Sequence, residues 1–216
     1  MHNFITFLIY SILLLGVMFI ADVLYNRFKL SSEWSRKIAH VGSGIVALTY
    51  PVYIDNHFIV LALTLSFTLI LYTSKKMGLF QSIFSVGRKS YGELFFVWSS
   101  WFLFWLYQYT GEVIYFYLPF SIVVFADTLA ALIGKKFPMI NYHIFGHKKS
   151  YGGSLAFFIT SFALSYYLAG QYLNDDYLLW FSFLHAMITT IIEAVSSKGW
   201  DNFTIPLASV LLIYLI

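Results

Sequence analysis

Long apolar runs separated by short polar segments cover most of the chain. Seven of these runs have the ~17–25 residues that an α-helix needs to cross a bilayer, and an eighth is shorter. The runs cover residues 4–25, 38–54, 57–73, 91–109, 112–134, 152–170, 177–197 and 203–216. The last would rise only about 20 Å, so it is expected to be tilted, partly interfacial or truncated. The pattern predicts an all-α integral membrane protein, a bundle of seven or eight transmembrane helices.

Composition supports the same class. Hydrophobic residues make up 60% of the 216 residues and charged residues 11%, whereas soluble domains carry about 25% charged residues. We therefore expect a single transmembrane catalytic domain over residues 1–216. The absence of cysteine excludes disulfides, thiolate nucleophiles and zinc–thiolate sites. The opening "MHNF" lacks a basic segment, so no cleavable signal peptide is expected.

Basic residues occur only around every second inter-run segment. All thirteen follow the first, third, fifth or seventh run or open the next one: Arg27, Lys29, Arg36, Lys37, Lys75, Lys76, Arg88, Lys89, Lys135, Lys136, Lys148, Lys149 and Lys198. The intervening segments carry acids alone: Asp55, Glu112, Asp175 and Asp176. The positive-inside rule then places the N-terminus outside and the basic segments in the cytoplasm.

The remaining acids lie at or near the same membrane face. They are Asp22, Glu33, Glu93, Asp127, Glu193 and Asp201. Acids and bases together at one face fit an anionic, metal-bound substrate that arrives from the cytosol. Each isolated lysine or arginine, taken alone, is explained more simply as an interfacial anchor.

Asp127 lies one to two helical turns inside the run 112–134. An aspartate near the middle of a span costs about 2.5–3.5 kcal/mol, and even nearer the interface it needs a partner. Small residues follow at helical spacing and would admit another helix, or a phosphate with its metal: Ala130, Ala131 and Gly134. Mg²⁺ prefers one or two carboxylates plus phosphate oxygens. Asp127 is therefore a candidate metal ligand; pairing with a lysine or a backbone group is the structural alternative.

The run 177–197 carries a polar stripe on one helical face, because its polar residues are three or four positions apart. The stripe comprises Ser182, His185, Thr189, Glu193 and Ser196. Hydrogen bonds between helices explain its serine, threonine and histidine members. Glu193 is harder to explain in that way, and Asp201 and Asn202 follow it closely. Asp201 alone also fits a helix-capping residue.

The segment "SRKIAHVGSGI", residues 35–45, opens the second run. Arg36, Lys37 and His40 form a cationic cluster suited to phosphate, since arginine offers planar donors. The alternative is a pair of interfacial bases beside a core histidine.

A basic, serine- and glycine-containing step occurs twice, as "GRKSYGELFF" (87–96) and "GHKKSYGGSLAFF" (146–158). In the first copy Ser90 and Glu93 have the spacing of a capping box, which would close the helix start. Alternatively, Glu93 is another acid of the site.

In the second copy Ser150 is the expected cap, but glycine replaces the glutamate. Gly152 and Gly153 would then leave backbone N–H groups open to an anion, with Lys148 and Lys149 beside them. We therefore predict a phosphate site at this helix start.

Together these segments resemble the polytopic CTP-dependent lipid kinases, which include dolichol, phytol and CTP-dependent diacylglycerol kinases and are similar to phosphatidate cytidylyltransferase. The matching stretches are "RKIAHVGSG" (36–44), "YGE" (91–93), "ADTLAALIGKKF" (126–137), "KKSYGGSLAFF" (148–158) and "IEAVSSKGWDNFTIP" (192–206). They occur in order along nearly the whole chain. The family has a glutamate where this chain has Gly152, so Glu93 or Glu193 would have to supply that carboxylate.

The residue patterns described above and the resemblance together give the candidate site. Catalytic candidates are Asp127, Glu193, His40 and Glu93. Nucleotide-binding candidates are Lys148, Lys149, Ser150, Gly152, Gly153, Ser154, Thr128, Gly134, Lys135, Arg36, Lys37 and Asn202. Magnesium would be held by Asp127, Asp201 and Glu193.

The resemblance implies transfer of the γ-phosphoryl group of CTP to a long-chain lipid alcohol at the cytoplasmic face. The preference for CTP rests on the resemblance alone. Expected partners are the lipid and the nucleotide, without nucleic acid, and a homodimer is left open. The main alternative is cytidylyl transfer from CTP to phosphatidate. A transporter would need polar residues through the outer half of several spans, and a purely structural protein would not need Asp127.

Overall fold

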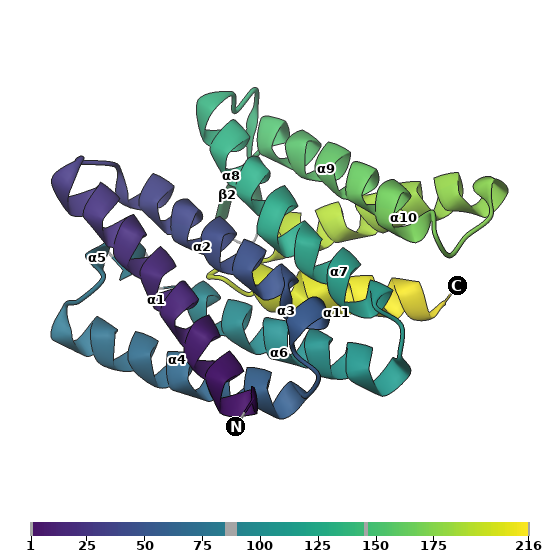
Figure 1. Ribbon diagram of the computed structural model, residues 1–216. Coiled ribbons are helices and arrows are strands. Elements are labelled where there is room, and N and C mark those ends of the chain that lie inside the picture. The colour runs from purple at the N-terminus through teal and green to yellow at the C-terminus, as the bar shows by residue number, and fades with distance from the viewer. Residues whose placement is uncertain (1, 85–89, 145–146, 216) are drawn as a thin grey trace.

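The protein is an α-helical bundle whose polypeptide crosses the molecule many times (Figure 1). The computed structural model describes residues 2–84, 90–144 and 147–215. Its helices are α1 (His2–Arg27), α2 (Ser32–Leu48), α3 (Tyr50–Tyr53), α4 (His57–Met77), α5 (Gln81–Phe84), α6 (Gly92–Thr110), α7 (Ile114–Ser121), the π-helix η1 (Ile122–Ala126), α8 (Asp127–Lys136), α9 (Tyr151–Ala169), α10 (Asp175–Val195) and α11 (Asp201–Tyr214). Arg88 and Lys89, part of the first repeated step, lie outside the described residues.

The predicted class of α-helical membrane protein is confirmed. Within the described ranges, five helices are long and apolar enough to cross a membrane: His2–Arg27, His57–Met77, Ile114–Lys136, Tyr151–Ala169 and Tyr177–Val195. Helices α2, α6 and α11 complete the bundle between these five. The count of seven or eight spans and the side of the N-terminus stay predictions.

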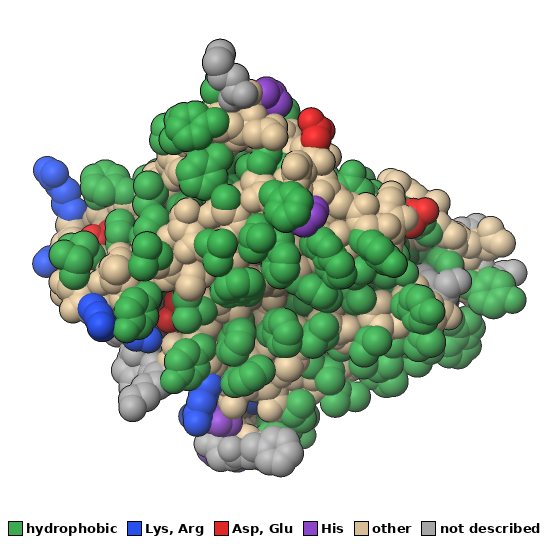
Figure 2. All heavy atoms as spheres, turned by 90° about the horizontal axis from the view of Figure 1, so that it is seen from below, with side chains coloured by type: hydrophobic (Ala, Val, Ile, Leu, Met, Phe, Trp, Pro, Cys, Tyr) green, Lys and Arg blue, Asp and Glu red, His purple; other side chains and the backbone are tan. Residues whose placement is uncertain are grey.

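Apolar side chains also cover the outside of the bundle. Figure 2 shows one face on which hydrophobic residues spread over the middle, with lysines and arginines toward its margins. Phe19 is 64% exposed and Leu69 63%, whereas Phe104 and Phe116 in the interior are 0% exposed. Large exposed apolar surface of this kind fits contact with lipid rather than with water.

The run that carries Asp127 is one continuous helical rod with a π-helical turn in its middle. The turn η1 lies between α7 and α8, and the Asp127 N–H donates to the Ile122 carbonyl five residues earlier. Pro119 precedes the turn and has no N–H to donate. Such π-turns are frequent at functional sites. Here the turn directly precedes the aspartate that the sequence analysis selected.

A β-hairpin interrupts the all-helical pattern between α8 and α9. Strands β1 (Asn141–Ile144) and β2 (His147–Ser150) are antiparallel, with Asn141 opposite Ser150. No pattern in the sequence predicted these strands. Four residues are too few to show an alternating pattern beside the long apolar runs. The hairpin carries Lys148 and Lys149 back toward the start of α9.

Candidate active site

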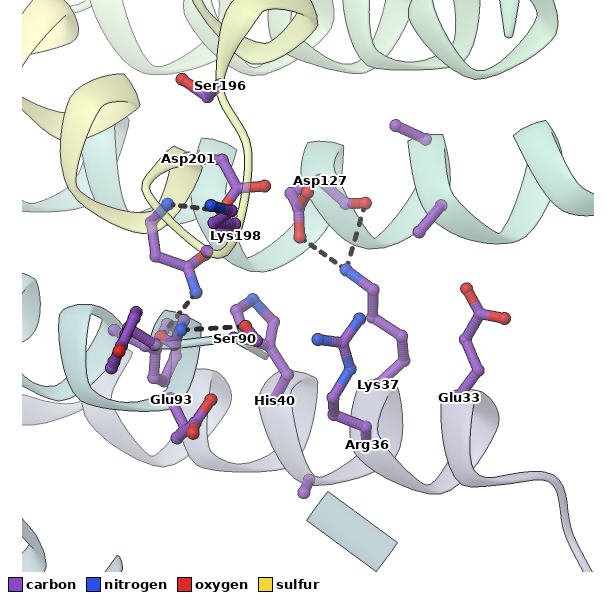
Figure 3. Close-up of a pocket in the computed structure, with 18 of the residues that line it drawn as sticks. Glu33, Arg36, Lys37, His40, Ser90, Glu93, Asp127, Ser196, Lys198 and Asp201 are labelled. Atoms are coloured by element: carbon purple, nitrogen blue, oxygen red, sulfur yellow. Dashed lines mark hydrogen bonds and ion pairs between the residues drawn. The ribbon is translucent and has the colours of Figure 1, made fainter. Parts of the chain in front are cut away.

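The described residues enclose a large cavity at the charged end of the bundle. Its volume is about 940 Å³, and residues from nearly all helices and from both strands line it. One end is polar and the other is apolar. Segments separated by more than 150 residues meet at the polar end, as Figure 3 shows for Lys37 and Asp201.

Helix α2 contributes a row of cationic side chains to the polar end. Arg36, Lys37 and His40 rise from α2 toward Asp127 on the facing rod (Figure 3). Lys37 Nζ lies 2.5 Å from Asp127 Oδ2 and 3.3 Å from the Asp127 carbonyl oxygen. Both side chains are largely buried, at 7% and 13% exposed. The buried aspartate is therefore neutralised by a lysine, the structural alternative that the sequence analysis named.

His40 is held by the π-turn. Its Nε2 lies 3.0 Å from the Val123 carbonyl oxygen, and a carbonyl can only accept, so Nε2 carries the proton. The ring also packs against Phe96, with 4.2 Å between ring centroids. In the neutral ring this leaves Nδ1 as a proton acceptor. The π-turn thus fixes the tautomer of a histidine that lines the cavity.

A second buried ion pair joins Lys149 to Glu193. The Lys149 ammonium bonds to the Glu193 carboxylate and lies 2.9 Å from the Glu193 carbonyl oxygen. The Glu193 side chain is 7% exposed and that of Lys149 19%. The pair ties strand β2 to the end of α10. Both conspicuous buried acids are therefore already neutralised by a lysine from a distant segment.

Asp201 is the third acid at the polar end. In Figure 3 it points from the start of α11 toward the space beside Asp127, and the two carboxylates lie close enough to interact electrostatically. Asp201 Oδ1 accepts the Asn202 N–H at 3.0 Å, which agrees in part with a capping role. Within the described chain no lysine or arginine lies within 4.0 Å of this carboxylate.

Asn202 fixes the start of α11 against α6. Its Nδ2 donates to the Gly92 carbonyl at 2.7 Å, and its own carbonyl accepts from Ser99 Oγ at 2.6 Å. The Oδ1 atom is buried without a hydrogen-bond partner among the described residues. Buried polar oxygens are normally satisfied, so this atom is an unused acceptor beside Asp201.

The capping box predicted in the first repeated step is wrong. Ser90 Oγ accepts from the Gly92 N–H at 3.1 Å instead of from residue 93. Glu93 lies 3.7 Å from Lys75 Nζ and lines the cavity. Since the glutamate does not close its own helix, the other interpretation of Glu93, as an acid of the site, remains a proposal.

The predicted anion site at the start of α9 is also wrong, although Ser150 does cap the helix as expected. Ser150 Oγ accepts the Gly153 N–H at 3.1 Å. The Tyr151 N–H donates to the Ile140 carbonyl at 3.0 Å, and the Gly152 N–H to the Pro138 carbonyl at 3.3 Å. The first three N–H groups of α9 therefore already have partners.

The glycines at this helix start serve packing. A Cβ atom at Gly152 would lie within 3.0 Å of the Phe137 carbonyl oxygen. A Cβ at Gly134 would lie 2.7 Å from Ser150 Oγ, and one at Gly153 would lie 2.9 Å from the Ala130 carbonyl oxygen. Gly152 does not line the cavity, so it is not placed to bind the nucleotide as predicted. Its missing side chain lets α9 approach the turn after α8.

Most residues selected from the sequence do meet around the cavity. Those that line it are Arg36, Lys37, His40, Glu93, Asp127, Gly134, Lys135, Lys148, Lys149, Ser150, Gly153, Ser154, Glu193, Asp201 and Asn202. Thr128 and Gly152 do not line the cavity. Thr128 is buried, and its hydroxyl has no hydrogen-bond partner among the described residues.

Three other lining residues were not predicted from the sequence to belong to the site. Glu33 pairs with Lys135 at 2.7 Å across the mouth, and Asn141 and His147 line the cavity from the hairpin. The position of Glu33, three residues before Arg36, was the available signal. The hairpin residues gave none, because only the fold brings them to the cavity.

Arg36 has a donor that no described residue satisfies. Its Nε is buried and unpartnered, and Arg36 lines the polar end of the cavity. A buried, unpaired guanidinium N–H is costly unless a ligand accepts from it. Arg36 is therefore better placed than the α9 helix start to bind an anion.

The polar stripe of α10 divides into two parts. His185 is 0% exposed, with Nδ1 2.9 Å from Ser165 Oγ and Nε2 2.8 Å from Ser209 Oγ. It thus links α9, α10 and α11, as the interpretation of interhelical hydrogen bonding predicted. Glu193, at the end of the stripe, lies at the cavity.

The carboxylates suit a metal that is shared with a substrate. Over the described ranges, no three His, Asp or Glu side chains group closely enough to bind a metal ion by themselves. Asp127, Asp201 and the unused Asn202 oxygen are nevertheless the oxygen ligands that Mg²⁺ takes together with phosphate groups. The donor set therefore fits Mg²⁺ held jointly with a nucleotide.

The fold and cavity define a multi-pass membrane protein with a charged site next to an apolar compartment. The chain is 30% identical over 205 residues to a phytol kinase of Synechocystis sp., covering 92% of this chain and 86% of the relative. It is 26% identical over 218 residues to phytol kinase 1, chloroplastic, of Arabidopsis thaliana, covering 90% of this chain and 70% of the relative. The chain therefore belongs to the phytol kinase family, and it is a lipid kinase. No family model and no solved structure matches it.

Proposed function

We propose that this protein transfers the γ-phosphoryl group of CTP to the hydroxyl of a long-chain lipid alcohol of the phytol or polyprenol type at the cytoplasmic membrane face. The observation that carries the proposal is the two-part cavity. Its polar end holds Asp127, Asp201 and the unsatisfied Arg36, and its other end is apolar. A phosphorylated nucleotide and a lipid alcohol can meet only in a site that offers both environments.

The polar end supplies positioning and charge, which is most of what phosphoryl transfer needs. Arg36 would donate to phosphate oxygens, and Lys148, which also lines the cavity, would add a second cation. Mg²⁺, when bound with the nucleotide, would supply positive charge that offsets the charge of the phosphate groups. Asp127 and Asp201 would hold it, with Glu193 as the remaining acid.

The two buried ion pairs would change partners when the nucleotide binds. Lys37 and Lys149 are each bonded to a carboxylate, and phosphate groups compete with carboxylates for ammonium groups. A lysine that turns to phosphate releases its carboxylate, and the released carboxylate would become a metal ligand. Each lysine and its acid would thus neutralise each other in the site without nucleotide and would separate when the nucleotide is bound.

His40 is our choice for the residue that takes the alcohol proton. Its Nε2–H is committed to the Val123 carbonyl, so Nδ1 is the free base. The alcohol oxygen would form a bond to the γ-phosphorus, the bond from that phosphorus to the β,γ-bridging oxygen would break, and CDP would leave. Glu193 is the second candidate for the base, although its carboxylate is bonded to Lys149.

A labelled-nucleotide assay tests the reaction. Purified protein is incubated with phytol or with phosphatidate and with CTP that carries the label at either the α or the γ phosphorus, and ATP is compared with CTP. Label from the γ position in the lipid is the expected result. Label from the α position would instead identify cytidylyl transfer, and the acceptor would then be phosphatidate.

A further inference from the structure

The apolar end of the cavity is a channel enclosed by four helices. One face of α2 and the start of α3 follow its length through Lys37, His40, Ser43, Ala47 and Tyr50, which are spaced by three or four residues. The facing walls come from α1, α4 and α6: Leu14, Met18, Leu63, Thr64, Phe67, Leu71, Phe96, Val97 and Ser100. Each helix thus contributes one row of side chains around a single axis.

Two hydroxyls in the walls of the channel, those of Thr64 and Ser100, are satisfied by the backbone. Ser100 Oγ donates to the Val97 carbonyl at 2.7 Å, and Thr64 Oγ1 donates to the same carbonyl at 3.4 Å. These hydroxyls are therefore satisfied by their own neighbourhood and present mainly carbon to the channel. Such a lining suits a hydrocarbon chain and does not suit water or a second charged ligand.

An aromatic cluster closes the far end of the channel. Tyr50 is 3% exposed and packs edge-on against Tyr10 and Phe104, with ring centroids 5.1 Å and 6.0 Å apart. Tyr10 is itself fixed by a 2.8 Å hydrogen bond to Thr49. A chain that enters from the polar end therefore meets a wall at Tyr50.

We propose that this channel holds the hydrocarbon chain of the acceptor, and that Ala47 and Tyr50 set the longest chain that fits. The proposal rests on the proposed function, because it takes the reacting hydroxyl to lie near Lys37 and Asp127. From Lys37 to Tyr50 the helical rise is about 20 Å at 1.5 Å per residue. An extended chain advances about 1.2 Å per bond, by analogy with the three backbone bonds of a residue. The channel therefore accepts a single chain of roughly 16 bonds.

The test measures kcat/KM for a series of alcohols that differ in chain length, with the full-length protein in lipid nanodiscs. The series is geraniol, farnesol, geranylgeraniol and a long polyprenol, and diacylglycerol serves as a two-chain acceptor. Wild type should prefer geranylgeraniol and should act on the polyprenol and on diacylglycerol at least about tenfold less well, since a longer chain cannot extend past Tyr50 and a second chain has no place in the channel.

Ala47→Leu places a larger side chain in the distal channel. It should lower kcat/KM for geranylgeraniol about tenfold, the effect of displacing roughly two buried methylene groups, and should leave geraniol unchanged. Ala62→Leu makes the same change on the exposed face of α4 and should alter neither. Leu14→Ala widens the channel, so it should raise kcat/KM for the longer alcohols. This variant tests the proposal even if Ala47→Leu does not fold.

Two results would overturn the inference while leaving kinase activity intact. One is equal kcat/KM for all chain lengths in wild type. The other is a uniform loss across the series in Ala47→Leu together with unchanged length preference in Leu14→Ala. Failure of wild type to phosphorylate any alcohol with any nucleotide would instead refute the proposed function, and the chain-length proposal would fall with it.

Discussion

Adding a single methyl group at Gly152 should destabilise the protein. The family resemblance places a glutamate here, yet a Cβ atom at this position would lie within 3.0 Å of the Phe137 carbonyl oxygen and 3.4 Å from the Pro138 carbonyl carbon. The neighbouring atoms are backbone, so they can move away only if α9 shifts from the turn after α8. Such a shift also endangers the hydrogen bond from the Gly152 N–H to the Pro138 carbonyl.

The size of the effect follows from these contacts. Overpacking costs about 1–3 kcal/mol and a lost backbone hydrogen bond about 0.5–1.5 kcal/mol. Replacing a helical glycine by alanine returns up to about 1 kcal/mol. The net loss for Gly152→Ala is therefore about 1–3 kcal/mol, and Tm should fall by roughly 2–12 °C for a chain of this length.

The assay is thermal unfolding in detergent, followed by tryptophan fluorescence, with Gly16→Ala as the matched control. Gly16 lies inside α1, and no neighbouring atom lies within 4 Å of the point that a Cβ atom would occupy there, so that variant should gain up to about 1 kcal/mol. The two glycine-to-alanine changes should thus shift Tm in opposite directions. An unchanged or raised Tm for Gly152→Ala would refute the packing argument, and so would a Gly152→Glu variant that folds and gains kinase activity.

Three further predictions concern buried or cavity-lining polar residues. Asp127→Asn should lower kcat more than about a hundredfold and also lower Tm, because it leaves Lys37 buried and unpaired. The double variant Lys37→Met, Asp127→Asn should regain Tm but not phosphoryl transfer. Recovered kinase activity in the double variant would contradict the metal-binding role of Asp127. Arg36→Gln should raise KM for the nucleotide about 10–100-fold, as expected for a lost charged hydrogen bond, whereas Lys76→Gln, exposed and outside the cavity, should not. His185→Leu should lower Tm, because it leaves the buried Ser209 hydroxyl unpaired and removes one of the two hydrogen bonds of Ser165. Both KM values should be unchanged in steady-state kinetics, and a raised KM would place His185 in the site.

The candidate acids could be recognised from the sequence because burying a charge in a membrane is costly. Asp127 and Glu193 stand out in apolar runs for that reason alone. Their partners could not be predicted in the same way. Lys37 precedes Asp127 by 90 positions, and no local pattern reports which of thirteen bases lies beside which acid.

The glycine-rich step shows the limit of sequence reasoning more sharply. A glycine that makes room for a ligand and a glycine that makes room for another helix cannot be distinguished in the sequence, since both positions require a missing Cβ. Only the contacts of Gly152 and Gly153 with the segment 130–138 distinguish the two roles. The π-turn before Asp127 and the hairpin of Lys149 could likewise not be predicted, because each is too short to show its own hydrophobic period.

The sequence alone determined three features of this protein. They are the apolar runs of membrane-spanning length, the placement of basic residues around alternate segments, and the identity of the buried acids. The free energy of moving each side chain into lipid depends on that side chain and its immediate neighbours. Tertiary structure decided which lysine neutralises which acid, where His40 donates its proton, and that four helices leave an apolar channel between them. These features depend on distances between segments far apart in the chain, which are set only when the helices pack.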